Sequence, residues 1–450
     1  MVLPRDRGMN GMGRADKQIG KAGHRLAILG LSVFLATISR PAFAQSGALD
    51  LADTGDTAWT LAASVLALAA TLPGFLLFAC GQARGRNQVT TLYQGTGAVL
   101  ASALAWAVAG YTLAFGHETE GWLGAGNAWM LREFGNLRAA SSIPESGFAL
   151  FQTTSTLLPV ATLVAFRSGR INTGWFMLFA PLWSLVAYAP LAHAIWGGGW
   201  ISKRFAPIDW NGGIVIGVAA GVSGLVLALM SAEREPAPSP LSPLGLLLVL
   251  LGAALFLVGR IAASGGQAFT GNDDAAAAML ATMLGAAAGA MTWLLLGLAT
   301  KRPPGPLSLA RGILCGLACI APAAGYVSPG GALVIGMIGT AVSYGLARAL
   351  QARTRLGDAG VLASVFAGGG ACGSLLAVPF IQPALGGTGH PSGTSAMDQL
   401  IGQAGTLAIA TVWIAGTTLI LATMVSLVRP MRPSQERIDQ GLDIATTDGF

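Results

Sequence analysis

The stretch Ser242–Ile261, which reads SPLGLLLVLLGAALFLVGRI, indicates the fold class of this protein. Arg260 is its one charged residue. An α-helix needs about 20 apolar residues to cross the hydrocarbon core of a bilayer. The whole chain has a similar character, because 53% of its 450 residues are hydrophobic and 10% are charged, against about a quarter charged in soluble domains. The sequence therefore predicts a protein embedded in a lipid bilayer.

Comparable apolar stretches recur along the chain, and we predict eleven membrane-spanning helices after the N-terminal segment. These helices are expected over residues 59–80, 91–115, 147–166, 174–195, 212–231, 242–261, 275–299, 307–324, 330–350, 359–380 and 404–428. The Pro-rich connector Pro236–Pro243 separates five of them from six. This pattern predicts an all-α membrane fold of two inverted five-helix repeats plus a C-terminal helix. In transporters of that kind the pathway lies between the repeats.

The charges in the loops predict the orientation of the chain. Basic residues follow every odd-numbered span: Arg84, Arg86, Arg167, Arg170, Arg234, Lys301, Arg302, Arg353, Arg355, Arg429, Arg432 and Arg437. The opposite loops are acidic or mixed, with Lys203 and Arg204 as the main exception. Because cytoplasmic loops carry the excess of Lys and Arg, we expect a multi-pass protein of the bacterial inner membrane. Its mature N-terminus lies outside and residues 429–450 form a cytoplasmic tail.

The N-terminal segment is typical of a secretory signal peptide. A basic region up to Arg25 precedes the apolar stretch Leu26–Ile38, and Ala42-Phe43-Ala44 then provides a cleavage site of the A-x-A kind. We expect cleavage after residue 44, with an uncleaved first helix as the alternative. The predicted organisation is a signal peptide over 1–44, a transmembrane domain over 45–428 and the tail.

Several functional classes find no support in the sequence. The net charge of +6 resides in short loops, which indicates topology rather than binding of nucleic acid. The cysteines lie inside apolar segments and form no CxxC motif, so neither a disulfide framework nor a metal site is predicted. The Gly-rich stretches lack the Lys of a phosphate-binding loop, and His390 has no evident catalytic partner. We therefore expect neither an enzyme nor a cofactor.

Five short motifs stand out along the chain: Pro73–Phe78 with Gly81, Arg84 and Asn87; Pro190–Gly199; Asp209–Gly213; Pro322–Tyr326 with Gly330–Ala332; and Glu436-Arg437 with Gly441–Asp443. Together they resemble the ammonium transporter/Rhesus superfamily, from about Asp56 to Phe450. The resemblance implies a homotrimer in the lipid bilayer with one pore per subunit. It also implies a cytoplasmic tail that can meet a PII-type signal protein.

The resemblance assigns substrate-binding roles to four residues. Trp196 matches the tryptophan of the outer recruitment site, where an aromatic face can hold a cation. Ser264 matches the serine of that site, and Phe151 matches the first aromatic residue of the third helix. Asp209 matches the acid before the fifth helix. Each residue has a structural alternative. Trp196 could be an interfacial tryptophan, Ser264 a helix-packing serine and Phe151 a core phenylalanine. For Asp209 we expect a helix cap as the main role.

The sequence departs from the family pattern along the expected pore. The twin histidines that face each other in the family fall on Gly217 and Gly369, and its stacked phenylalanine gate falls on Ser155 and Arg260. We expect these four residues to line the pore. The polar relay that would accept a proton as ammonium becomes ammonia is therefore missing.

Arg260 has the largest energetic consequence. A charged side chain within a span costs at least about 2.5–3.5 kcal/mol unless it meets water or a partner. At roughly 8 Å from a bound cation it would disfavour that cation by about 2 kcal/mol at an effective dielectric of about 20. Asp209, Asp273 or Asp274 could neutralise it. The alternative is an arginine that extends to the outer interface.

Three functional hypotheses follow. The first is a trimeric channel of this family that conducts ammonia or ammonium by a modified route. The second is a repurposed paralogue with a glycine-lined, Arg260-gated pore for a neutral or anionic solute. The third is a non-conducting sensor that signals through its tail.

Overall fold

The computed structural model describes residues 51–443, apart from residues 84, 120, 127–130, 132–134, 167–169, 232–240, 303, 355, 392, 435, 437, 439 and 440. The expected signal peptide over 1–44 lies outside the described residues, as do residues 444–450 of the predicted tail. Of the predicted basic residues, Arg84, Arg167, Arg234, Arg355 and Arg437 also lie outside them.

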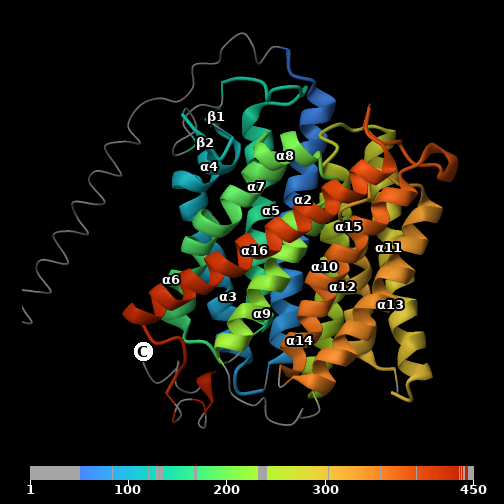
Figure 1. Cartoon of the computed structure of the whole chain (residues 1–450). Helices are drawn as coiled ribbons and strands as arrows, with labels where there is room; N and C mark the ends of the chain where they lie inside the picture. The colour runs from blue at the N-terminus through green and yellow to red at the C-terminus, as the bar shows by residue number, and fades with distance from the viewer. Residues whose placement is uncertain are drawn as a thin grey trace, which may run out of the picture. The chain divides into compact units, whose positions relative to one another are not determined.

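Apolar helices make up most of the described unit (Figure 1). The first half contains five spans, some of which join two or three helical segments end to end. They are α2 (Thr54–Gln82); α3 (Gln88–Ala105), η2 (Trp106–Gly110) and α4 (Tyr111–Phe115); α5 (Glu145–Phe166); α6 (Thr173–Trp183), η4 (Ser184–Tyr188) and α7 (Ala189–Trp196), followed by α8 (Trp200–Phe205); and η5 (Gly213–Val218) with α9 (Ala219–Met230).

The second half contains five further spans and a final helix. They are α10 (Pro243–Gly266); α11 (Asp273–Ala299); α12 (Pro306–Ile320); α13 (Pro329–Arg353); α14 (Gly357–Ala363), η6 (Ser364–Gly368) and α15 (Gly369–Phe380), followed by η7 (Pro383–Leu385); and α16 (Ala396–Val428). Ten of the described helices are long and apolar enough to cross a membrane, and α12 is a shorter apolar helix. The predicted fold class is confirmed. Because each half has an odd number of spans, equivalent helices of the halves run in opposite directions.

The first helices of the two halves, α2 and α10, pack against each other through glycines. A Cβ atom on Gly74 would lie 2.5 Å from the amide nitrogen of Phe256, and one on Gly252 would lie 2.6 Å from the carbonyl oxygen of Gly74. Any side chain at these positions would therefore push the helices apart. Close approach through small residues is how helices gain contact in lipid, where no hydrophobic effect drives them together.

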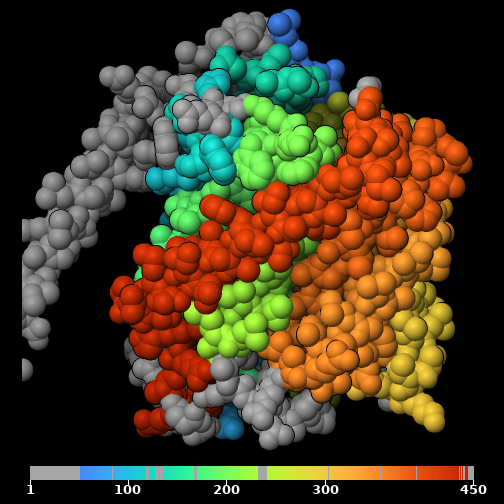
Figure 2. Space-filling model, in the orientation of Figure 1, coloured from blue at the N-terminus to red at the C-terminus, as the bar shows by residue number. Residues whose placement is uncertain are grey.

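The bounds of several helices differ from the prediction, and for α12 and α16 the structure shows the cause. The span expected over 307–324 ends at Ile320. The chain turns at Ala321–Pro322, and Pro322 has no backbone N–H group to donate the next hydrogen bond of the helix. The span expected over 404–428 begins earlier, at Ala396, where Ser395 and Asp398 form a capping box. Its 33 residues extend about 50 Å, beyond the bilayer core of about 30 Å. Consistent with that length, α16 runs obliquely across the outside of the other helices (Figures 1 and 2).

A small hairpin was not predicted. Strands β1 (His117–Thr119) and β2 (Leu123–Ala125) pair antiparallel between α4 and α5. Gly121 lies in the turn with a φ of 79°, a conformation that glycine adopts readily. Strands of three residues are too short for alternating hydrophobicity to identify them.

The last described residues of the tail bind the start of α3. The Asp443 carboxylate accepts hydrogen bonds from the backbone amides of Val89 (3.3 Å) and Thr90 (2.7 Å). The Leu442 amide donates to the side-chain oxygen of Asn87 at 2.9 Å. An acidic side chain is favourable at this end of a helix. The tail therefore contacts the helical unit through defined hydrogen bonds.

Candidate functional site

A cavity of about 20 Å³ lies inside the bundle, between the two halves. A single water molecule needs about 10–15 Å³ of such space, so the cavity has room for one or two molecules of that size. Its lining residues are Leu158, Thr162, Gly212, Gly213, Ile216, Gly217, Phe256, Arg260, Leu314, Leu317, Ala318, Ala321 and Phe366. Among them, Thr162 and Arg260 are the residues with polar side chains.

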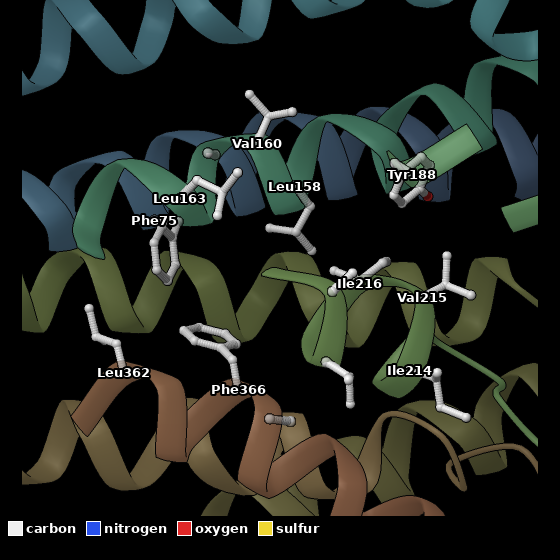
Figure 3. Close-up of a cluster of buried hydrophobic side chains, with 14 of the residues drawn as sticks. Phe75, Leu158, Val160, Leu163, Tyr188, Ile214, Val215, Ile216, Leu362 and Phe366 are labelled. Carbon is white, nitrogen blue, oxygen red and sulfur yellow. The ribbon is translucent and has the colours of Figure 1, made fainter. Parts of the chain in front are cut away.

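Several apolar walls of the cavity come from elements that are distant in sequence. Leu158 of α5, Ile216 of η5 and Phe366 of η6 approach one another in Figure 3. The Phe366 ring meets Phe75 of α2 edge to face, with centroids 5.5 Å apart. Phe75 also packs on Phe256, at 5.4 Å. Aromatic rings therefore close the space beside the cavity.

Gly217 and Gly369 lie in the fifth and tenth spans, next to π-helical segments. Gly217 lies within η5, and Gly369 directly follows η6. A Cβ atom on Gly217 would find Phe366 as its nearest neighbour, with the carbonyl oxygen 3.4 Å away. A Cβ atom on Gly369 would instead lie 3.1 Å from the Cβ of Ala318, which lines the cavity. Gly217 thus borders the cavity directly, whereas Gly369 lies behind one of its walls.

Arg260 of α10 is 5% exposed and lines the cavity. Its Nη2 donates a hydrogen bond to the carbonyl oxygen of Asn211, and the Asn211 side-chain amide donates to the Arg260 carbonyl oxygen at 3.3 Å. Among the described carboxylates none lies within ion-pair distance of it, so Asp273 and Asp274 do not neutralise it. Its side chain is also too buried to reach the outer interface. The guanidinium is therefore a buried positive charge with a carbonyl partner, and the charge of Asp209 offsets part of it without an ion pair.

The strap, residues 209–211, joins α7, α10 and the end of α12. The Trp196 indole of α7 donates to the carbonyl oxygen of Asp209 at 2.9 Å. The Trp210 indole donates to the carbonyl oxygen of Ser264 in α10, also at 2.9 Å. Two predicted binding residues, Trp196 and Ser264, are thus linked through this one segment.

The end of α12 holds the strap from the other side. The amide of Trp210 donates to the carbonyl oxygen of Pro322 at 3.0 Å, and that of Asn211 to the carbonyl oxygen of Ala321 at 2.8 Å. These carbonyl groups are available because α12 ends at Ile320. The early end of this helix is therefore part of how Asn211 is positioned against Arg260.

Asp209 caps the fifth span. Its carboxylate accepts hydrogen bonds from the amides of Ile214 (2.9 Å) and Val215 (3.0 Å) in the first turn of η5. Burial raises the pKa of this carboxyl group, and the amide hydrogen bonds and the charge of Arg260 oppose that rise. The cap that we expected as its main role is present, and the carboxylate points at helix amides.

Ser264 makes its hydroxyl contacts between helices. The hydroxyl group donates to the carbonyl oxygen of Ala278 at 3.2 Å and accepts from the Thr282 hydroxyl at 2.8 Å. Both partners belong to α11. In this structure the hydroxyl group joins α10 to α11 and is outside the cavity lining.

Phe151 and Ser155 lie on α5 before the cavity. Phe151 is fully buried and meets Phe269 edge to face, with centroids 5.2 Å apart. Ser155 precedes Leu158 by three residues and Thr162 by seven, which places it on the same helix face. Of the four residues predicted to line the pore, Arg260 and Gly217 border this cavity, and Ser155 and Gly369 flank it.

Among the residues of the site that were not predicted from the sequence are Thr162, Phe366 and Asn211. Thr162 lines the cavity, and its hydroxyl group donates to the Leu158 carbonyl oxygen at 2.9 Å. Phe366 precedes Gly369 by three residues, a spacing that places both on one helix face. Asn211 belongs to the recognised Asp209–Gly213 motif, so it was a candidate partner for a buried charge. No group of three metal-ligating side chains occurs in the described part of the chain.

Known proteins resemble this chain in sequence and in structure. The sequence profile described as "Ammonium Transporter Family" matches residues 58–450. A putative ammonium transporter of Methanothermobacter thermautotrophicus is 32% identical over 400 residues, which cover 87% of this chain and 97% of the relative. The crystal structure of Saccharomyces cerevisiae Mep2 is similar with a TM-score of 0.77 at 26% identity, covering 89% of this chain and 92% of that one. A solved structure named "Sensor Amt Protein" shares the fold with a TM-score of 0.79 at 20% identity, covering 88% and 98%.

Proposed function

The chain belongs to the ammonium transporter family, and from that premise we propose that it conducts ammonia across the membrane in the neutral form. The buried guanidinium of Arg260 in the cavity wall is the observation that carries this proposal. Curated relatives of this chain are named ammonium transporters, which makes ammonia and ammonium the first solutes to consider. The charge of Arg260 then decides between the two.

A cation in the cavity would lie close to this guanidinium. At about 8 Å separation and an effective dielectric of about 20, the repulsion is about 2 kcal/mol, and it grows as the distance shrinks. Arginine cannot lose its proton to relieve that repulsion. Neutral ammonia experiences no such penalty, and its size is close to that of the water molecule that the cavity accommodates.

The setting of this activity is part of the proposal. We infer a homotrimer in the bacterial inner membrane, with a cleaved signal peptide over 1–44, a transmembrane domain over 45–428 and a cytoplasmic tail over 429–450. The mature N-terminus is outside, and the tail is available to a PII-type signal protein. Trp196, Asp209, Phe151 and Ser264 are proposed to form and support the outer approach to the cavity. The activity involves no catalytic step and no cofactor.

The test is ammonia flux into proteoliposomes that contain a pH-sensitive dye. An inward ammonium gradient should alkalinise the lumen faster than in empty liposomes, because entering ammonia takes up a proton. The rate should not change when a potassium gradient with valinomycin imposes a membrane potential. Alkalinisation at the rate of empty liposomes would contradict conduction. Accumulation of labelled methylammonium driven by the potential would contradict the neutral species.

Replacement of Arg260 by methionine tests the role of the charge. Arg260→Met keeps an unbranched side chain but removes the repulsion, so we expect potential-driven methylammonium uptake to rise at least about tenfold, which corresponds to about 1.4 kcal/mol. Arg348→Met in α13, outside the cavity lining, is the matched control and should not change uptake. Equal uptake by both variants would show that the charge of Arg260 does not determine the selectivity of the pore.

A second candidate is a repurposed paralogue for another neutral or anionic solute, which the same Arg260 and Gly217 favour. Arg260→Phe should then lower permeation of that solute, and if no tested solute is affected the idea fails. A third candidate, a sensor signalling through its tail, draws on the described tail contacts with α3. It requires a partner, so the absence of binding to PII-type proteins in every nucleotide state would count against it.

A further inference from the structure

We propose that the cavity binds a small monovalent anion of the halide class on the guanidinium of Arg260. This anion is an additional ligand, and it is distinct from the ammonia that the proposed function conducts. The inference starts from the buried charge, the character of the cavity walls and the size of the space.

The guanidinium has more donors than its described partners use. Arginine carries five N–H donors and no acceptor, and the carbonyl oxygen of Asn211 is the hydrogen-bond partner described for this side chain. The side chain borders the cavity, so a ligand placed there can accept from the remaining donors.

The carboxylate of the strap, Asp209, does not accept hydrogen bonds from the remaining donors of Arg260. Asp209 directs its two oxygen atoms at the amides of Ile214 and Val215. It forms no ion pair with Arg260 within 4 Å. It lowers the net positive potential at the cavity without entering it. Because Asp209 offsets part of the charge of Arg260, a monovalent anion fits this site better than a divalent one.

The walls strengthen the attraction and limit the size of the ligand. Ile216, Phe256, Leu317 and Phe366 surround the same space with hydrocarbon, and charges attract more strongly in such low-dielectric surroundings. The hydroxyl group of Thr162 already donates to the Leu158 carbonyl oxygen, so it offers no directed donor to a larger oxyanion. A volume of about 20 Å³, room for one or two water molecules, admits a monatomic ion.

The bound anion would occupy the space that ammonia needs. If the proposed function holds, chloride therefore slows ammonia flux by competing for the cavity. This consequence rests on the proposed function, but anion binding itself does not. The direct experiment accordingly measures binding rather than transport.

Bromide is the probe, because its anomalous scattering locates it. Crystals of the full chain grown in sodium bromide should show an anomalous peak within hydrogen-bonding distance of the Arg260 guanidinium. In detergent, sodium chloride should raise the melting temperature by a few degrees relative to sodium gluconate at equal ionic strength. That difference should vanish in Arg260→Met and persist in Arg348→Met.

Two results would overturn the proposal. One is wild-type crystals with no bromide peak beside Arg260. The other is a chloride-dependent melting shift that is equal in wild type and Arg260→Met. If Arg260→Met does not fold, Arg260→Lys keeps the charge with fewer donors and should show a smaller shift. Because neither readout measures ammonia flux, a failure of conduction and a failure of anion binding are distinguishable.

Discussion

Gly217 and Gly369 occupy equivalent places in the two halves, yet their surroundings differ. Gly217 lies within a π-helical segment in the fifth span of its repeat and Gly369 directly follows one, and such segments are frequent at functional sites. Gly217 borders the cavity, whereas the Cβ of Ala318 stands between Gly369 and that space. An inverted repeat can thus keep a similar backbone pattern in two helices and still give only one of the two glycines direct contact with the cavity.

The largest expected effect comes from filling the cavity through Gly217. In Gly217→Leu the new side chain extends into a space of about 20 Å³, so ammonia-driven alkalinisation should fall to the rate of empty liposomes. Gly345→Leu in α13 is the matched control, because no atom lies within 4 Å of a Cβ built there. Stopped-flow measurement of lumenal pH compares the two variants. Unchanged flux in Gly217→Leu would place the pathway elsewhere.

A smaller effect should distinguish the two glycines by stability. Alanine in place of a helical glycine gains up to about 1 kcal/mol, and Gly217→Ala should keep much of this gain because its nearest contact is 3.4 Å. Gly369→Ala must accommodate a 3.1 Å contact with Ala318, so we expect it to be less stable than Gly217→Ala by about 1 kcal/mol. Unfolding in mixed micelles measures this difference. Equal stabilities would show that Ala318 moves away from the new methyl group at little cost in free energy.

The smallest expected effect on flux comes from removing the hydroxyl group of Thr162, which lines the cavity. Thr162→Val preserves shape and removes a group that bonds to the helix backbone. Flux should stay within about twofold of wild type, less than about 0.4 kcal/mol. A collapse of flux, with the variant correctly folded, would mean that Thr162 acts as a polar relay. The comparison of the two glycines would then omit an essential part of the pathway.

The strap and the cavity also differ in how far the sequence predicted them. Trp196, Asp209 and Ser264 were identified from local motifs, and the structure links all three through residues 209–211. For the hydroxyl group of Ser264 the sequence left two roles open, a substrate contact and a helix-packing contact, and in the structure it bonds to α11. A motif names the residue at a position, but the direction of a hydroxyl group depends on which helix packs beside it.

The amino-acid sequence by itself determined the membrane class and the division of the spans into two halves. These follow from local composition, because a span of apolar residues cannot remain in water. The tertiary structure decided what Arg260 touches and which glycine opens onto the cavity. Asn211 and Arg260 are 49 residues apart in the chain, and their contact exists because α10 and the strap meet at the end of α12. Such a contact depends on packing in three dimensions, which hydropathy along the chain does not encode.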